Sequence, residues 1–163
     1  MITVRDARPA DAPAIAAVYN EGIEERTSTF ETTLRTPSDI RDWLAAGERL
    51  PVLVAAEDGV VRGWARIARY SERPAYGGVG EVSVYVERSS RGRGLGRRLL
   101  ESLGVRAAEF DYWKLTGKLF ADSTASAALV RRCGWREVGR HLRHGRLDGV
   151  WRDITVVERL LDG

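Results

Sequence analysis

The 163-residue chain is poor in cysteine and lysine, and it has no long hydrophobic run. Its single cysteine, Cys133, cannot form an internal disulfide, which fits a reducing compartment. Beside Gly134 we expect this cysteine to be a packed small hydrophobe rather than a nucleophile. No apolar stretch approaches the roughly 20 residues of a membrane helix, and residues 1–5 lack the apolar core of a signal peptide. These absences predict a cytoplasmic protein that does not contact membranes.

Only two of the 26 basic residues are lysines, Lys114 and Lys118, and the formal net charge is +3. So small an excess does not require nucleic acid as a partner, and it suits a small polyanion such as a nucleotide at least as well. The chain is 44% hydrophobic and 30% charged, which is ordinary for a soluble globular protein. We expect residues 1–163 to form a single domain with a substantial core, and we predict no metal site.

Hydrophobic periodicity and turn residues predict a mixture of strands and helices. Strands are predicted at residues 2–8, 51–57, 60–70, 81–87, 114–121, 135–142 and 150–160, with a hairpin turn at Asp58-Gly59 between the second and the third. Helices are predicted after Asp11, after Thr36, at 97–109 and at 124–133. The order β-α-α-β-β-β-α-β-α-β-β predicts an α/β fold with a mixed sheet and helices on both faces. It does not match the doubly wound Rossmann order.

The segment Arg91-Gly92-Arg93-Gly94-Leu95-Gly96 lies between an apolar strand and a helix. Such a turn presents unpaired backbone N–H groups at a helix N-terminus, which attracts phosphate. Arginines at positions 88, 91, 93, 97 and 98 surround it. It is not a P-loop, because no Gly-Lys-Ser/Thr follows, and its position does not fit a dinucleotide fingerprint. A solvated helix start and a nucleic-acid patch remain alternatives, although no aromatic residues are interleaved with the arginines.

The pattern Arg-x-x-Gly-x-Gly after a Val-x-Val strand resembles the acetyl-CoA-binding motif of the Gcn5-related N-acetyltransferases (GNAT). The predicted element order is also that of this superfamily. The resemblance implies a central mixed sheet in which the strand before the turn splays from its neighbour. The strand would then hold the pantetheine arm, and the loop amides would hold the pyrophosphate. The residues implied for the cosubstrate acetyl-CoA are Val84, Tyr85, Val86, Arg91, Gly92, Arg93, Gly94, Leu95, Gly96, Arg97, Ser123 and Ser126.

Longer segments resemble the phosphinothricin acetyltransferase family, and residues 124–160 resemble its arsinothricin-resistance branch. These segments run in order along nearly the whole chain: residues 5–15, 19–20, 28–31, 73–76, 81–86, 143–145 and 151–153. The resemblance implies direct acetyl transfer from acetyl-CoA to the primary amine of a small amino acid or analogue, such as phosphinothricin, arsinothricin, methionine sulfone or methionine sulfoximine. No covalent enzyme intermediate is implied. It also implies a homodimer.

The same resemblance suggests three catalytic residues. Glu81 matches the proposed general base of the family, and an exposed strand-edge carboxylate is its plain alternative. His144 could relay a proton or orient substrate, because histidine titrates near neutrality; a plain hairpin histidine is the alternative. Tyr85 could contact the substrate or the oxyanion with its hydroxyl. His141 matches no family position, and we expect it to be structural.

Arg73 and Tyr76 match the loop with which the family grips the anionic groups of its substrate, and Phe30 matches an aromatic residue that closes the pocket. An arginine fork binds two oxygens at once, which suits a carboxylate or phosphinate. A surface arginine and two packed aromatic rings are the alternative. Ser71 replaces a frequent basic residue two positions before Arg73, which leaves the identity of the substrate open. Ser123 replaces a common asparagine that opens the helix beside coenzyme A, where a serine can still cap the helix and hydrogen-bond the pantetheine.

Three other functions stay open. The acceptor could be another amine or a peptide N-terminus. The chain could be a coenzyme-A-binding regulatory module without turnover, although the presence of Glu81, Tyr85 and His144 together argues against this. A nucleic-acid-binding protein is the third alternative, and it would show steeply salt-dependent binding.

Overall fold

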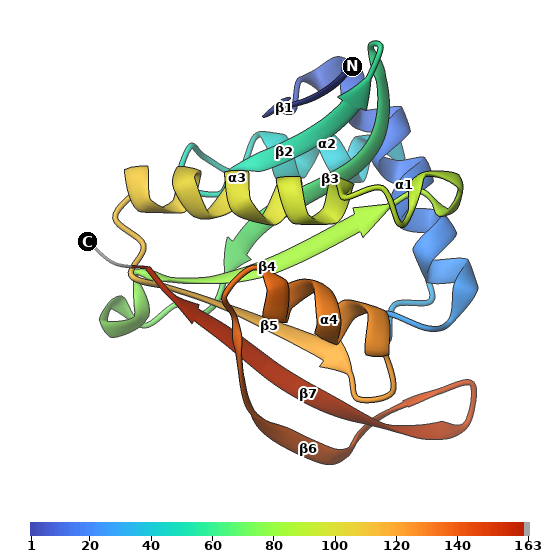
Figure 1. The fold of residues 1–163 in the computed structure, drawn as a ribbon, viewed down its shortest axis with the longest axis vertical. Coiled ribbons are helices and arrows are strands. Elements are labelled where there is room, and N and C mark those ends of the chain that lie inside the picture. The colour runs from blue at the N-terminus through green and yellow to red at the C-terminus, as the bar shows by residue number, and fades with distance from the viewer. Residues whose placement is uncertain (162–163) are drawn as a thin grey trace.

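Seven strands form one mixed sheet across residues 1–161, which are the residues that the computed structural model describes (Figure 1). The strands are β1 (Ile2–Asp6), β2 (Val52–Glu57), β3 (Val60–Arg69), β4 (Val79–Val86), β5 (Lys114–Phe120), β6 (Arg136–Leu147) and β7 (Val150–Leu160). The α-helices are α1 (Ala12–Glu25), α2 (Pro37–Leu44), α3 (Leu95–Glu109) and α4 (Thr124–Arg132). The predicted α/β fold and its element order are confirmed.

The strand order is β1-β2-β3-β4-β5-β7-β6, and every neighbouring pair is antiparallel except β4 and β5. The predicted hairpin turn between β2 and β3 is present, with φ of 49° at Asp58 and 85° at Gly59. Two positive φ angles match the twist of the flanking strands. Local turn chemistry therefore sets this hairpin, whereas the parallel β4–β5 pair depends on the crossover through α3.

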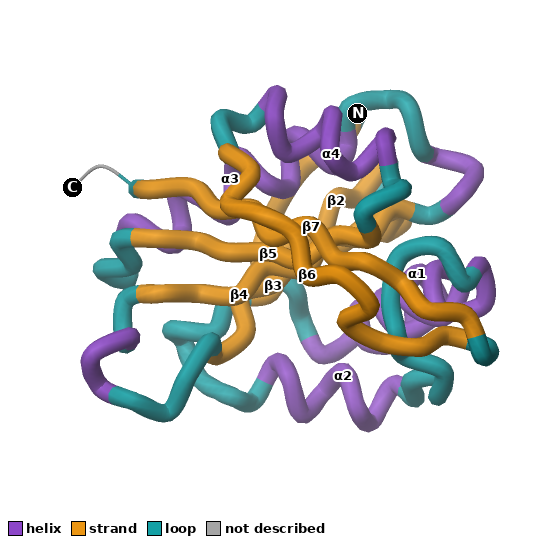
Figure 2. Tube along the Cα trace, turned by 90° about the horizontal axis from the view of Figure 1, so that it is seen from below, coloured by secondary structure: helices purple, strands orange, loops and turns teal. Residues whose placement is uncertain are grey.

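Helices cover both faces of the sheet, with α1 and α2 on one side and α3 and α4 on the other (Figure 2). Under α3, Leu99 and Leu103 are fully buried against the sheet. Under α1 and α2, Trp64 of β3 is 1% exposed. The central strands are thus buried on both faces, which fixes their register. No helix between residues 1 and 161 is both long and apolar enough to cross a membrane.

Several element bounds differ from the sequence predictions: the first strand ends at Asp6 rather than at residue 8, and β4 begins at Val79 rather than at 81. Helix α3 begins at Leu95 rather than at 97, because Gly94 adopts φ 85° and allows the chain to enter the helix earlier. Strand β6 continues to Leu147 rather than ending at 142, because it stays paired with β7 up to Val150. Asp11 precedes α1 as predicted, but its side chain does not cap that helix.

The Asp11 carboxylate instead ties β1 to the start of α1. It accepts hydrogen bonds from Arg5 at 2.8 and 3.0 Å and from the backbone N–H of Arg8 at 2.7 Å. The hydrogen bonds from Arg5 hold the pKa of Asp11 below its ordinary value, against the opposing effect of burial. This ion pair involves none of the predicted site residues, and it stabilises the scaffold.

Candidate active site

Strands β4 and β5 lie side by side over only three residue pairs and then separate (Figure 1). Pairing begins at Val79 and ends where Glu81 lies beside Thr116. Beyond this point β4 stays paired with β3 as far as Val86, whereas β5 follows β7. The backbone groups of residues 82–86 that face β5 have no strand partner within the described chain, and such an edge can pair with an extended ligand. We call this stretch the β4–β5 divergence.

A glycine-rich turn, residues 91–94, joins the end of β4 to α3. Gly92 and Gly94 have φ angles of 78° and 85°, which other residues adopt only with strain. A Cβ atom at either position would meet no protein atom within 4 Å, so the outer side of the turn is open. The first N–H groups of α3 have no intrahelical acceptors at this open end. Together with the helix dipole they fit a phosphate group.

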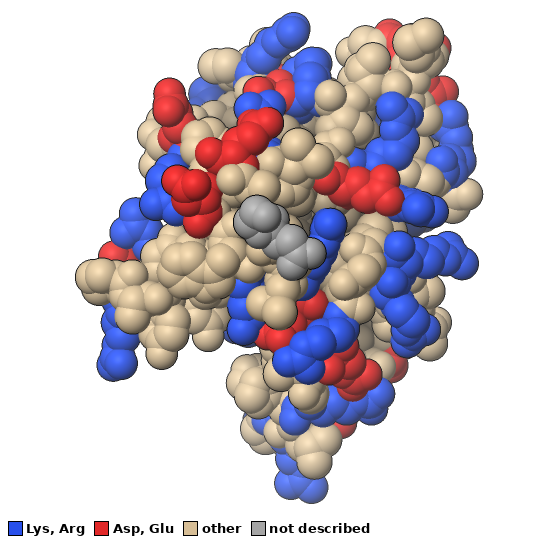
Figure 3. All heavy atoms as spheres, turned by 60° about the vertical axis from the view of Figure 1, so that its left-hand side comes forward, with Lys and Arg blue, Asp and Glu red and all other residues tan. Residues whose placement is uncertain are grey.

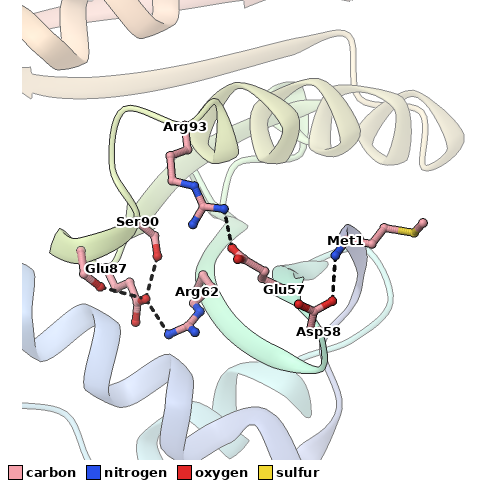
Figure 4. Close-up of polar contacts among 8 residues, drawn as sticks. Met1, Glu57, Asp58, Arg62, Glu87, Ser90 and Arg93 are labelled. Carbon is pink, nitrogen blue, oxygen red and sulfur yellow. Dashed lines mark hydrogen bonds and ion pairs between the residues drawn. The ribbon is translucent and has the colours of Figure 1, made fainter.

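The turn is held in place by Glu87 (Figure 4). Its carboxylate accepts hydrogen bonds from the hydroxyls of Ser89 at 3.1 Å and Ser90 at 2.7 Å and from Arg62 of β3 at 2.9 Å. Burial favours the neutral form of Glu87, but these hydrogen bonds outweigh it and lower its pKa. These contacts anchor the segment that leads from β4 into the turn.

The arginines predicted to bind phosphate already have carboxylate partners. The pairs are Arg91–Glu25 at 2.6 Å, Arg93–Glu57 at 2.7 Å and Arg97–Glu101 at 2.8 Å. The hydrogen bonds from Arg91 hold the pKa of Glu25 below its ordinary range. Acidic and basic side chains are likewise interspersed on the face shown in Figure 3. The groups left free at the turn are backbone N–H groups, and each of these three arginines would have to exchange a glutamate for a phosphate.

The apolar residues predicted to bind the cosubstrate offer only their backbone atoms. The side chains of Val84 and Val86 lie on the sheet face that α3 covers and pack against the core there. Leu95 is 1% exposed. A Cβ atom on Gly96 would lie 3.0 Å from Leu129 of α4, so this glycine allows the two helices to approach.

Glu81 lies at the apex of the β4–β5 divergence, where the two strands separate. Its side chain is about one-third exposed, and its Oε1 atom lies 3.9 Å from the Nζ atom of Lys118 on β5. This places a carboxylate at the end of the divergence opposite the glycine-rich turn. The geometry is suitable for a base that takes a proton from a group in the divergence. Sequence analysis selected Glu81 but not Lys118.

Tyr85 shares a sheet face with Glu81 but lies four residues further along β4, about 13 Å away in an extended strand. Its ring stacks on Trp64 at 5.2 Å and meets Tyr19 of α1 at 4.9 Å. The backbone of α1 approaches it closely, because a Cβ atom on Gly22 would come within 2.8 Å of the Tyr85 ring. Burial raises the pKa of Tyr85 to about 12, so its hydroxyl is a donor at neutral pH.

The two histidines lie together on β6, where the pairing register with β7 is irregular between His141 and Gly145. Their rings are stacked, with centres 4.3 Å apart, and both side chains are exposed. Strands β5 and β7 lie between them and β4, so His144 does not touch Glu81 within this chain. Among residues 1–161 no three histidine, cysteine, aspartate or glutamate side chains gather as a metal site would require.

The predicted substrate loop lies between β3 and β4, at the Glu81 end of β4. Tyr76 ends a short 3-10 turn there and packs edge-on against Tyr70 at 5.9 Å. The hydroxyl of Ser71 accepts the backbone N–H of Arg73 at 3.1 Å, which shapes the loop. Both Arg73 and Tyr76 are exposed. The fold thus brings these two residues to the same end of the sheet as Glu81.

The remaining predicted residues gather at the other end of β5. Phe30 packs edge-on against Phe120, the last residue of β5, with ring centres 4.9 Å apart. A Cβ atom on Gly145 would lie 2.7 Å from the Phe30 ring, so β6 holds this ring in place. Ser123 and Ser126, at the start of α4, hydrogen-bond to each other through their hydroxyls at 2.9 Å.

The known proteins that this chain resembles include acetyltransferases. The model of the acetyltransferase (GNAT) family matches residues 15–135. The chain is 36% identical to a phosphinothricin N-acetyltransferase of Alcaligenes faecalis, over 98% of this chain and 83% of that protein. It is 32% identical to an L-methionine sulfoximine/L-methionine sulfone acetyltransferase of Pseudomonas paraeruginosa, over 98% and 95%.

A solved structure is similar over nearly the whole fold. It is a GNAT superfamily phosphinothricin acetyltransferase from Sinorhizobium meliloti in complex with acetyl-CoA, with a TM-score of 0.91 and 29% identity, covering 98% of this chain and 88% of that one. The family match spans well over half of the chain, including the β4–β5 divergence and the glycine-rich turn. The chain therefore belongs to the acetyltransferase (GNAT) family.

Proposed function

We propose that this chain transfers the acetyl group of acetyl-CoA to the primary amine of a small amino acid or analogue of the phosphinothricin, arsinothricin, methionine sulfone or methionine sulfoximine type. The relatives named for phosphinothricin and for the methionine analogues support this substrate class. The single observation that carries the proposal is the β4–β5 divergence, which leads from an anion-binding turn at one end to Glu81 at the other.

The residues present fit acetyl-CoA, which supplies an activated acetyl group when bound. In this proposal the N–H groups of residues 92–97 hold the pyrophosphate. The free edge of β4 carries the outward backbone groups of Val84 and Val86 and pairs with the extended arm, whereas the backbone of Tyr85 is paired with Trp64 of β3. The Val86 carbonyl, which accepts a hydrogen bond from Arg91 at 3.0 Å, would have to be released by that arginine. The free edge spans five residues, or about 16 Å. An extended arm bound along it would therefore run from the glycine-rich turn to Glu81. Ser123 and Ser126 flank the ligand from the start of α4.

Transfer requires a neutral amine in the correct orientation. Glu81 accepts the amine proton, directly or through water, as the nitrogen bonds to the acetyl carbon and the thiolate leaves. Arg73 and Tyr76 orient the amino acid, and Phe30 closes the site. The Tyr85 hydroxyl can donate a hydrogen bond to acetyl-CoA. It cannot act as a base, because it stays protonated at neutral pH. His144 acts on the substrate or through water, because β5 and β7 separate it from Glu81.

Direct attack is favoured over a covalent enzyme intermediate. The only cysteine, Cys133, is 7% exposed at the C-terminal end of α4. Burial raises the pKa of its thiol, which keeps it protonated and a poor nucleophile. The hydroxyl of Ser83 also lies in the β4–β5 divergence, but both histidines lie on β6, across β5 and β7, so no histidine is placed to activate it as a nucleophile. In this proposal the amine itself therefore attacks the thioester.

We further propose that the chain acts as a single cytoplasmic domain in a homodimer. The β6–β7 hairpin is at the edge of the sheet and exposes large apolar side chains: Val138, Leu142, Val150 and Trp151. An apolar edge of this kind is usually covered by a partner. Light scattering of the purified chain measures the mass; a monomer at micromolar concentration would overturn the homodimer.

The experiment that tests the function is a thiol-release assay with acetyl-CoA and a panel of amines. The panel contains phosphinothricin, arsinothricin, methionine sulfone, methionine sulfoximine and a peptide with a free N-terminus. Calorimetry of acetyl-CoA binding runs in parallel. We expect micromolar binding and turnover of at least one amino-acid analogue. Binding without turnover of any amine would instead identify a coenzyme-binding module, and turnover of the peptide alone would identify a different acceptor.

A further inference from the structure

Three neighbouring strands place charged side chains around Glu81 on the sheet face that α1 and α2 cover. Arg66 of β3 pairs with Ser83, which lies two residues after Glu81. Lys118 of β5 lies two residues after Thr116, the partner of Glu81. Because successive side chains of a strand alternate between faces, Arg66, Glu81 and Lys118 share one face.

Arg66 is half-buried, and its guanidinium group makes no hydrogen bond or ion pair with any other residue among 1–161. The guanidinium carbon lies 3.8 Å from the centre of the Trp43 ring of α2, and this stacking orients the fork. Burial lowers the pKa of Arg66, while Tyr19 and Glu81 act in the opposite direction. An arginine side chain nevertheless stays charged in proteins.

Two other partly buried arginines, Arg35 of the α1–α2 loop and Arg62 of β3, are paired. Arg35 forms an ion pair with Glu31 at 2.9 Å, and Arg62 forms one with Glu87 at 2.9 Å. Withdrawing a cation from water costs free energy unless a partner compensates for the lost solvation. The contrast indicates that the partner of Arg66 is a ligand rather than a protein carboxylate.

We propose that Arg66 binds the anionic side-chain group of the amino-acid substrate, a phosphinate or a similar oxyanion. This inference rests on the proposed function. An arginine fork matches two oxygens on one centre. Arg66 supplies on β3 the positive charge that Ser71 does not supply in the loop.

The position of Arg66 separates the side-chain anion from the α-carboxylate. Residues that are diagonal across paired strands are about 7–8 Å apart, so Arg66 lies a short side chain away from Glu81, where the amine reacts. The α-carboxylate and the amine are bonded to the same carbon atom. The α-carboxylate therefore lies nearer to Glu81 than the side-chain anion does. Lys118, 3.9 Å from Glu81, is the cation beside that position.

The test compares an acceptor with an anionic side chain, phosphinothricin, with one whose side chain is uncharged, methionine sulfone. Arg66→Met keeps the apolar contact with Trp43 but removes the charge, and Arg66→Lys keeps the charge but removes the fork. Arg41→Met removes an equal charge from the exposed side of α2 and is the control. Thermal unfolding of each variant reports whether it is folded.

We expect Arg66→Met to lower the ratio of kcat/KM for phosphinothricin to kcat/KM for methionine sulfone by at least about tenfold, mainly through KM. Arg66→Lys should give an intermediate ratio, and Arg41→Met should keep the ratio within about twofold. An equal loss with both acceptors, or no loss, would overturn the assignment. If Arg66→Met does not fold, an unchanged ratio in Arg66→Lys overturns it.

A binding measurement separates this inference from the proposed function. Calorimetry compares the affinity of phosphinothricin for the wild-type chain and for Arg66→Met, each saturated with coenzyme A. Binding at least about tenfold tighter to the wild type supports the role of Arg66 even if neither acceptor is turned over, which would count against the proposed function alone. Equal affinity, or no binding to the wild type, overturns the role of Arg66.

Discussion

The two ends of β4 are built in different ways. At its C-terminal end the candidate site consists of backbone N–H groups from one contiguous segment, residues 91–97, held by Glu87. At its N-terminal end the site consists of side chains from three strands: Arg66, Glu81 and Lys118. An anion site made of backbone amides is encoded locally, whereas a reaction site made of side chains depends on strand register. Substitutions should therefore act differently at the two ends.

The largest effect is expected at the reaction end. Glu81→Gln removes the proton acceptor but keeps the shape of the side chain, so kcat should fall about 100-fold or more. The KM for acetyl-CoA should change little, because the anion-binding turn is untouched. Steady-state kinetics over the full pH range make the measurement, with Glu109→Gln, an exposed glutamate at the end of α3, as the control. A kcat near that of the wild type throughout the pH profile would remove Glu81 from the mechanism.

A substitution in the glycine-rich turn should instead change mainly the KM for acetyl-CoA. Gly94→Ala places a Cβ atom on the open side of the turn at φ 85°, which both strains and obstructs it. We expect the KM for acetyl-CoA to rise about tenfold, with the KM for the amine unchanged. Gly149→Ala, at φ 79° in the β6–β7 turn, carries similar strain away from the site. Equal effects of both substitutions on KM would show that strain, and not the anion site, is responsible.

A third substitution should affect neither end. Asp11→Asn breaks the ion pair with Arg5 and should lower the free energy of unfolding by about 1–3 kcal/mol while leaving both KM values unchanged. The pKa of Asp11 is lowered in the folded state, so this stability is present above the ordinary carboxyl pKa of 3.8 and is lost as the pH falls through the lower folded value.

Urea unfolding of the wild type and Asp11→Asn at neutral and acidic pH measures this difference. The difference should shrink as the solution is acidified. If it instead grew toward low pH, the ionised Asp11 would not be the source of the stability.

The smallest effect is expected from Lys118→Gln. The Nζ atom of Lys118 is 3.9 Å from Glu81, and its side chain is 54% exposed, so water and salt weaken its influence. We expect kcat/KM for the amine to fall about threefold at low ionic strength and less at high ionic strength. A loss that does not depend on salt would point to a shape effect rather than to charge.

The sequence was sufficient to predict the features that depend on neighbouring residues. The glycine-rich turn, the Asp58-Gly59 hairpin and the element order all follow from local spacing and turn chemistry, and they are present. Family resemblance placed Glu81, and the fold shows it at the apex of the β4–β5 divergence. Its role as a base stays a prediction.

The features that escaped prediction depend on residues distant in the chain. Arg66 and Lys118 become neighbours of Glu81 only through the pairing of three strands. The glutamates that engage Arg91 and Arg93 come from α1 and β2, which no local pattern connects to the turn. The Arg97–Glu101 pair, by contrast, has the i,i+4 spacing of a helix and is readable from the sequence. The stacking of His141 on His144 likewise follows from an irregular register in β6.

Within residues 1–161, strand pairing joins the block β1–β4 to the block formed by β5, β7 and β6 through three residue pairs. An acetyl donor that hydrogen-bonds along the free edge of β4 would fill the space between β4 and β5. It would then add contacts between the two blocks as well as take part in the reaction. Its departure would leave the two blocks less firmly joined. Amide hydrogen exchange in residues 82–86 would then report donor occupancy directly, with no acceptor present.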